Sequence, residues 1–180
     1  DYIMGNSLVD MYARCGYLAE AEYGFYKLSE QDIISYSALI AGYAELGLCD
    51  EALNSLGSMR SDGIIPDEIT FVSILKACGS VQDIDSGLQI HAEIIKEEFE
   101  RDIFIGNKLV DFYAKCGMLD KARQVFQSLS VRDIVAWSAL QSGYYEYGFD
   151  EETLNCLEQM QLEGVSPDVV IYVCSLKACG

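Results

Sequence analysis

The sequence predicts an all-α protein in which antiparallel helix pairs stack into a superhelix. The main reason is an internal repeat: residues 1–79 and 102–180 are identical at 38 of 79 aligned positions, and GNSLVDMYARCG returns as GNKLVDFYAKCG. Apolar residues recur at helical spacing between glycines and prolines, and no segment shows sustained alternation with a period of two. A tandem array of helix pairs buries its apolar faces only by stacking, as helical solenoids do.

Shorter units make up the 101-residue repeat. Their boundaries are marked by aspartates at spacings of 31, 35, 35, 31 and 35 residues, namely Asp1, Asp32, Asp67, Asp102, Asp133 and Asp168. These lengths are close to those of known two-helix repeats. We therefore expect a single array over residues 1–180, divided into units at 2–32, 33–67, 68–102, 103–133 and 134–168, with a partial unit at 169–180.

The unit at residues 33–67 illustrates the expected helix pair. Its first helix lies between Asp32 and Gly47, where apolar side chains at helical spacing form one face. Its second helix begins with Asp50 as N-cap and ends at Gly63, before Pro66. The same signals predict that other first helices end at Gly16, Gly79, Gly117 and Gly148. A later second helix is expected to end at Gly164, before Pro167.

Composition limits the classes of function. Of the 180 residues, 51% are hydrophobic and 23% charged, which predicts a folded chain. Its net charge of −17, from 12 basic and 29 acidic residues, argues by itself against nucleic-acid binding, because phosphate neutralisation supplies much of that affinity. No apolar run is long enough to cross a membrane. We expect acidic residues to gather on the second helices, at Glu20, Glu22, Glu51, Glu93, Glu97, Glu98, Glu151, Glu152 and Glu158.

Signals of metal or catalytic chemistry are weak. Four of the seven cysteines repeat, Cys15 with Cys116 and Cys78 with Cys179, which predicts buried packing sites and reduced thiols instead of a disulfide framework. No Cys-x-x-Cys occurs, so we expect no zinc site and no cofactor. His91 is the only histidine, and its His-x-Glu lacks the Pro-Cys-x-x-Cys of zinc deaminases. We predict that this chain is not an enzyme.

Several segments resemble the pentatricopeptide repeat (PPR) family of plant organelles, and in particular its PLS class. In that class 35-residue P motifs, 35-residue L motifs and 31-residue S motifs alternate. LVDMYARCGYLAEAEYGF resembles an S motif, SYSALIAGYAELGLCDEALNSLGSMRSDGIIPD a P motif, and EITFVSILKACG with GLQIHAEIIK an L motif. The resemblance implies a right-handed superhelical solenoid with the motif order S, P, L, S, P and a partial L.

The resemblance also implies single-stranded RNA binding, with one base for each motif. In the family the fifth and last residues of a motif select the base. The fifth residues here are Asn6, Ser37, Val72, Asn107, Ser138 and Val173, and the last residues are Asp32, Asp67, Asp102, Asp133 and Asp168. By the family's pattern, Asn with Asp favours uracil over cytosine and Ser with Asp favours guanine. The expected target is therefore U-G-x-U-G-x, 5′ to 3′, where x marks an L motif.

The second residue of each motif is implied to supply the apolar contacts that sandwich the base. These residues are Ile3, Ile34, Ile69, Phe104, Val135 and Val170. Both sets of positions have a simpler interpretation. Aspartate before a helix is a favoured N-cap whatever else it does, Asn6 and Asn107 fit ordinary polar positions near a helix start, and the apolar residues fit a core.

A second hypothesis is a helical scaffold that binds a protein, and an acidic solenoid suits basic partners. The resemblance implies one such partner, a multiple organellar RNA editing factor docked on the L motif, where Val72 lies in the segment Glu68–Lys96. Exposed ends of the array could also self-associate. A duplicated scaffold that has lost binding is a third hypothesis.

The resemblance places the wider protein in the mitochondrion or chloroplast, guiding RNA processing such as C-to-U editing. The chain does not begin with Met, and we expect a piece of a longer protein whose targeting segment lies outside it. The deaminase-like domain of many relatives is not part of this sequence.

Overall fold

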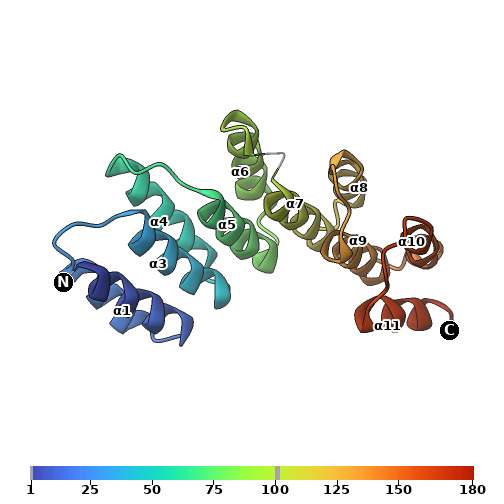
Figure 1. Ribbon diagram of the computed structural model, residues 1–180, viewed down its shortest axis with the longest axis horizontal. Coiled ribbons are helices and arrows are strands. Elements are labelled where there is room, and N and C mark those ends of the chain that lie inside the picture. Colours follow the sequence, from blue (N-terminus) through green and yellow to red (C-terminus); the bar gives the residue numbers. More distant parts are fainter. Residues whose placement is uncertain (1, 100–101) are drawn as a thin grey trace. The chain divides into compact units, whose positions relative to one another are not determined.

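The structure is a computed structural model that describes residues 2–99 and 102–180, and these residues form eleven helices and no strand (Figure 1). The all-α prediction is therefore confirmed. Asp1, the first of the six spaced aspartates, lies outside the described residues, as do residues 100 and 101 of the expected unit 68–102. The chain divides into two compact units, Asp1–Ile94 and Ile95–Gly180.

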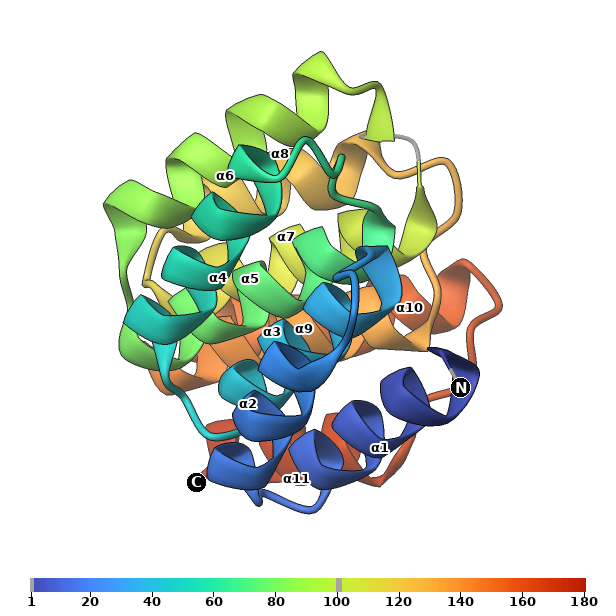
Figure 2. The same cartoon turned by 90° about the vertical axis from the view of Figure 1, so that its left-hand side faces the viewer.

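The N-terminal unit is a row of helix pairs. Its helices are α1 (Tyr2–Arg14), α2 (Leu18–Lys27), α3 (Ile33–Glu45), α4 (Cys49–Ser61), α5 (Glu68–Val81) and α6 (Ile84–Lys96), of which the last two residues of α6 belong to the next unit. Helix α1 packs against α2, and α3 packs against α4 (Figure 2). The first helices also pack on one another, α1 on α3 and α3 on α5, which forms a continuous inner layer.

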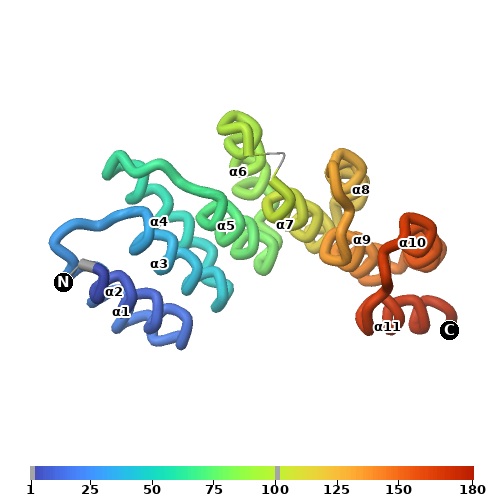
Figure 3. Tube along the Cα trace, in the orientation of Figure 1, coloured from blue at the N-terminus to red at the C-terminus, as the bar shows by residue number. Residues whose placement is uncertain are grey.

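The C-terminal unit repeats this arrangement. It contains α7 (Ile103–Lys115), α8 (Leu119–Ser128), α9 (Ile134–Glu146), α10 (Asp150–Leu162) and α11 (Val169–Ala178). Here α7 packs on α8 and α9, and α9 packs on α10 and α11, as the chain trace in Figure 3 allows the reader to follow. Each helix pair thus relies on its neighbour to cover its apolar residues, as expected for a solenoid.

Aspartates begin the first helices. Asp32, Asp67, Asp102, Asp133 and Asp168 each accept a hydrogen bond from a backbone N–H in the first turn of α3, α5, α7, α9 and α11. The prediction that Asp50 caps the second helix is wrong, since α4 begins after Leu48. The Leu48 N–H bonds to the Tyr43 carbonyl, 3.0 Å away, so the tight turn itself fixes the start. Asp50 lies in the first turn, where its charge complements the helix dipole.

Glycines end most helices where the sequence predicts. Gly47 follows α3 with φ of +69°, and Gly16, Gly63, Gly117, Gly148 and Gly164 share this left-handed conformation. Gly79 is the exception, and its prediction is wrong. It is buried inside α5, which continues to Val81, and the left-handed residue is Gln82, with φ of +57°. The N–H groups of Gln82 and Asp83 both bond to the Cys78 carbonyl and close this end of the helix.

The cysteines do not share one packing site. All seven are free thiols, and only Cys78 of the four repeating residues is buried. Cys15 and Cys179 are exposed and Cys116 is half-buried, because each lies just past the last residue of its helix. No helix in the described part of the chain is long and apolar enough to span a bilayer.

Candidate nucleic-acid interface

A groove of about 620 Å³ runs along the N-terminal unit, over α1, α3 and the start of α5. Its lining contains six of the residues that the sequence singles out. The second-position residues are Ile3, Ile34 and Ile69, and the predicted base-selecting residues are Asn6, Ser37 and Asp67. The first turns of the first helices thus gather these positions on one surface, because the helices pack side by side, and α3 and α5 each begin at an aspartate cap.

The second-position residues are exposed in both units, so the core interpretation of them is wrong. Ile3, Ile34, Ile69, Phe104, Val135 and Val170 are between 49% and 75% exposed. Neighbouring residues in the same turns, such as Thr70 and Ile105, are fully buried. The difference follows from helix geometry, since each second position is turned away from the helices that pack on the motif. Each expected motif therefore has an exposed apolar side chain in its first helix, against which a planar ligand could pack.

The fifth and last residues of both predicted S motifs bind each other. The Asn6 amide nitrogen Nδ2 donates to both carboxylate oxygens of Asp32, at 3.1 and 3.0 Å. Asn107 repeats this contact with Asp133, at 3.0 Å to each oxygen. Both asparagines are about 95% buried, and the Oδ1 atom of each is buried without a hydrogen-bond partner in the described part of the chain. Each Oδ1 atom therefore keeps its lone pairs free to accept a hydrogen bond.

In the first predicted P motif, the fifth and last residues are connected indirectly. The Ser37 hydroxyl lies 2.8 Å from the Thr70 hydroxyl, and Thr70 donates to Asp67 Oδ1 at 2.7 Å. Serine is shorter than asparagine, so a residue of the next helix bridges the distance to the aspartate. The family pattern does not single out Thr70; the one sequence signal for its role is its position three residues after the Asp67 cap.

The second P motif lacks this bridge. The residue equivalent to Thr70 is Ile171, which offers no hydroxyl, and the Ser138 Oγ atom is buried with no hydrogen-bond partner among the described residues. Asp168 accepts from the Ile171 backbone N–H at 3.0 Å and so keeps its role as helix cap. The two P motifs therefore carry the same predicted pair in different hydrogen-bond states.

The fifth residues of the predicted L motifs, Val72 and Val173, offer no polar contact. Val72 is half-buried on α5, and Val173 is 41% exposed on α11. Asp102 accepts from the backbone N–H groups of Phe104 and Ile105, at 2.8 and 3.0 Å, and caps α7. A base at these motifs would meet apolar surface at the fifth position.

Charge around the groove is largely neutralised by local pairs. Arg14 binds Asp10 at 2.8 Å, and Lys76 lies 2.5 Å from Glu45.

The expected acidic residues on second helices are mostly exposed there, among them Glu20, Glu51, Glu151, Glu152 and Glu158, while Glu97 and Glu98 lie just beyond α6. The Tyr43 hydroxyl donates to Glu22 at 2.5 Å, and Glu93 pairs with Arg60. The groove therefore offers hydrogen bonds and apolar contact more than phosphate neutralisation.

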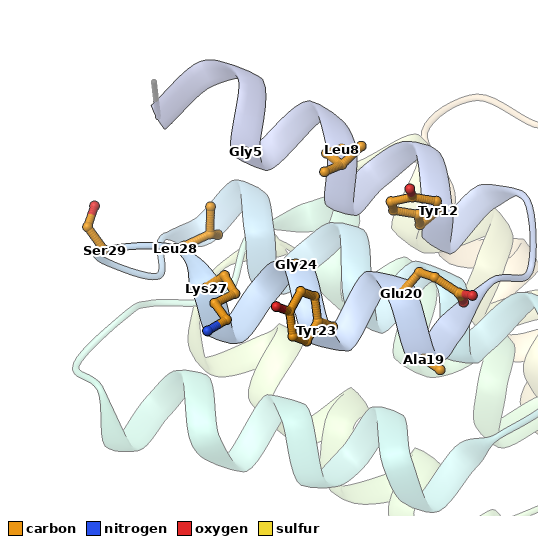
Figure 4. A pocket seen from close by; sticks show the side chains of 10 residues that line it. All are labelled: Gly5, Leu8, Tyr12, Ala19, Glu20, Tyr23, Gly24, Lys27, Leu28 and Ser29. Atoms are coloured by element: carbon orange, nitrogen blue, oxygen red, sulfur yellow. The ribbon is translucent and has the colours of Figure 1, made fainter.

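A second hollow, of about 780 Å³, lies between α1 and α2 (Figure 4). Leu8, Tyr12 and Tyr23 line it, and Lys27 lies at its edge. In the second copy of the repeat the residues equivalent to Leu8 and Tyr12 are Leu109 and Tyr113, which are at most 2% exposed. Two of the residues that line the hollow thus correspond to residues that are buried by packing in the second copy of the repeat. None of the site residues predicted from the sequence lines the hollow.

Two family models match the chain. A model described as PPR repeat family matches residues 31–80, and one described as PPR repeat matches residues 6–33 and 107–134. Together they cover more than half of the sequence. The predicted P motif at 33–67 lies within the first match, and the predicted S motifs at 2–32 and 103–133 overlap the second.

Two similar curated proteins are from Arabidopsis thaliana. The chloroplastic pentatricopeptide repeat-containing protein At4g18520 is 39% identical over 179 residues, which are 99% of this chain and 29% of that protein. The protein named "Putative pentatricopeptide repeat-containing protein At3g13770, mitochondrial" is 37% identical over 177 residues, which are 98% of this chain and 28% of that protein. The chain thus spans less than a third of the length of either relative.

Solved structures share the fold. The crystal structure of the pentatricopeptide repeat protein PPR10 in complex with an 18-nucleotide psaJ RNA element matches with a TM-score of 0.86 and 22% identity, over 99% of this chain and 27% of that one. PPR10 from maize matches with a TM-score of 0.57 and 21% identity, over 99% of this chain and 31% of that one. Given the matched repeats, the named relatives and the shared fold, this chain belongs to the pentatricopeptide repeat family.

Proposed function

We propose that this chain binds single-stranded RNA and reads one base with each motif, in the order U-G-x-U-G-x from 5′ to 3′. The observation that carries the proposal is the groove in which exposed Ile3, Ile34 and Ile69 flank the base-selecting residues Asn6 and Ser37. A base between two successive second-position side chains would present its edge to the fifth and last residues. The match to PPR10, a protein solved in complex with RNA, supports this reading of the groove.

Uracil is favoured at the S motifs by the direction of the Asn–Asp contact. An ionised carboxylate only accepts, so Asp32 fixes the Asn6 amide with its nitrogen toward the carboxylate. The remaining Oδ1 atom is an acceptor, and uracil supplies a donor at its N3–H. Cytosine has an acceptor at N3 and would oppose it. The same reasoning applies to Asn107 with Asp133.

Guanine is favoured at the P motifs because its edge combines an acceptor with donors. The Ser138 hydroxyl has a proton to donate to O6, and Asp168 Oδ2 makes no hydrogen bond within the described residues, so it can accept from N1–H and the amino group. Asp67 Oδ2 is available in the same way.

The motif assignment behind this reading is part of the proposal. It comprises S motifs at 2–32 and 103–133, P motifs at 33–67 and 134–168, an L motif at 68–102 and a partial L motif at 169–180. We propose that the wider protein acts in the chloroplast or mitochondrion, where relatives are assigned by name, and guides RNA processing such as C-to-U editing.

The proposal is tested by fluorescence anisotropy at low salt. The 180-residue chain is titrated with labelled RNA UGAUGA and, as control, with ACAACA, in which both U-G pairs are changed. The variants Asn107→Ala and Ser138→Ala are titrated in parallel. We expect preference for the first RNA and its loss in the variants. Equal, negligible binding of both RNAs would overturn the proposal and favour the protein-scaffold alternative, with pull-down of a multiple organellar RNA editing factor as the next measurement.

A further inference from the structure

The two P motifs carry identical pairs, Ser37 with Asp67 and Ser138 with Asp168, yet their serine hydroxyls are in different states. We propose that the third residue of the next motif's first helix, Thr70 in α5 or Ile171 in α11, determines how strictly the serine selects its base. Residues 134–168 would then discriminate guanine from adenine more strongly than residues 33–67. This inference rests on the proposed function and adds a specificity-determining residue to it.

The direction of the hydrogen bonds in the first P motif follows from proton count. Thr70 has one hydroxyl proton, and it donates that proton to Asp67 Oδ1 at 2.7 Å, since a carboxylate only accepts. Ser37, 2.8 Å from Thr70, must then be the donor in the contact between the two hydroxyls. Thr70 is fully buried, so no water competes for either contact.

Ser37 therefore enters RNA binding with its proton already used. Guanine O6 is an acceptor, so Ser37 can donate to it only after it gives up its bond to Thr70. In its resting state the Ser37 oxygen offers only lone pairs, which suit the amino group of adenine. Discrimination between guanine and adenine at this motif then depends mostly on Asp67.

In the second P motif no such competition exists. Ile171 occupies the place of Thr70 and is also fully buried, and it holds its aspartate only through the backbone, at 3.0 Å from Asp168. Ser138 Oγ is buried and has no partner among the described residues. Its donation to guanine O6 breaks nothing, and adenine, with an amino group in that place, would leave the hydroxyl proton unsatisfied.

The expected difference is about fivefold, which corresponds to about 1 kcal/mol, the typical net contribution of one neutral hydrogen bond. Selectivity at a position is the ratio of the Kd for the adenine RNA to the Kd for the guanine RNA. It is measured with the 180-residue chain and three RNAs: UGAUGA, UAAUGA for the first P motif, and UGAUAA for the second. In the wild-type chain we expect the ratio at the fifth base to exceed that at the second base about fivefold.

Reciprocal variants test the assignment. Thr70→Val removes the hydroxyl at nearly constant shape and is expected to raise the ratio at the second base about fivefold, without change at the fifth. Ile171→Thr is expected to lower the ratio at the fifth base alone. The matched controls are Thr70→Ser, which keeps a hydroxyl, and Ile171→Val, which shortens the side chain without adding one; both should leave the ratios unchanged. Melting temperatures are recorded to confirm that each variant is folded.

The outcomes separate this inference from the function beneath it. If the wild-type chain prefers guanine equally at both positions, or if Thr70→Val and Ile171→Thr leave both ratios unchanged, Thr70 and Ile171 have no role in specificity. If neither position prefers guanine at all, the proposed base reading is itself overturned, and this inference with it.

Discussion

The amide nitrogen of Asn107 lies 3.0 Å from each carboxylate oxygen of Asp133, and the same carboxylate accepts the backbone N–H groups of Val135 and Ala136 at the start of α9. One aspartate therefore caps a helix and fixes the orientation of a buried amide on the neighbouring helix. Other aspartates in the chain cap helices without an asparagine partner. A comparison with them therefore separates the stability that comes from the helix cap from the stability that comes from the Asn107–Asp133 contact.

Asp133→Ala is expected to destabilise the fold by about 2–4 kcal/mol, since it removes a helix cap and leaves the buried Asn107 amide unpaired. Asp168→Ala removes a cap alone, at the start of α11, and is expected to cost about 1 kcal/mol. Urea unfolding followed by circular dichroism measures both. Equal losses for the two variants would contradict a structural role for the Asn–Asp contact.

Phe104 and Ile105 are adjacent on α7 but are expected to have opposite roles. Phe104 is 73% exposed, so Phe104→Ala should change the free energy of unfolding by less than about 0.5 kcal/mol while it weakens RNA binding about fivefold or more, through lost contact with a base. Ile105 is fully buried, and Ile105→Ala should cost about 2–5 kcal/mol of stability. An unchanged RNA affinity in Phe104→Ala would remove the second positions from the interface.

Two helical glycines predict opposite responses to alanine. Gly57 in α4 has open space around the position of an added Cβ, so Gly57→Ala should stabilise the chain by about 0.5–1 kcal/mol through helix propensity. Gly143 in α9 lies against α7, where a Cβ would stand 2.7 Å from Ala114 Cβ and 3.2 Å from its Cα. Gly143→Ala should therefore destabilise by about 1–3 kcal/mol. Thermal unfolding would contradict this packing if both variants became more stable.

Alkaline pH is expected to destabilise the C-terminal unit. Burial, with a smaller effect of Glu152, raises the pKa of the Cys156 thiol from 9.0 to about 12, and burial raises the pKa of Tyr113 from 10.0 to about 12. In the unfolded chain these groups ionise at their ordinary pKa values, so their contribution to stability is complete below about pH 9 and is lost as the pH rises toward 12. The melting temperature should fall over this range. In Cys156→Ala the fall should be shallower, and an identical slope would exclude this thiol as a cause.

Much of the fold could be predicted from the sequence because its signals are local. The repeated aspartates identify the starts of the first helices, and glycines identify most of their ends. The predicted end at Gly79 is wrong because α5 continues to Val81 and is closed by Gln82. Gln82 is a non-glycine residue in a left-handed conformation, which sequence patterns rarely reveal. Asp50 misled because the tight turn before α4 needs no side-chain cap.

The candidate site was predictable as a set of positions but not as a set of bonds. Helical periodicity cannot distinguish an apolar residue on an exposed first turn from one in the core, so Ile34 and Phe104 fitted both interpretations until their exposure was known. The Ser37–Thr70–Asp67 connection joins residues of two successive motifs across packed helices. It depends on tertiary packing between α3 and α5, which no local pattern in the sequence encodes.

Under the proposed base reading, the boundary aspartates both cap helices and select bases, and this limits how such an array could change its target over evolutionary time. Any residue that replaces Asp32, Asp67 or Asp133 must still accept backbone N–H groups at the start of a helix. Only Asp, Asn, Ser and, less well, Thr do this with a side chain. Helix capping therefore limits which residue types can occupy the last position of a motif, whatever base is to be bound. The fifth position lies inside the helix and is free of that limit.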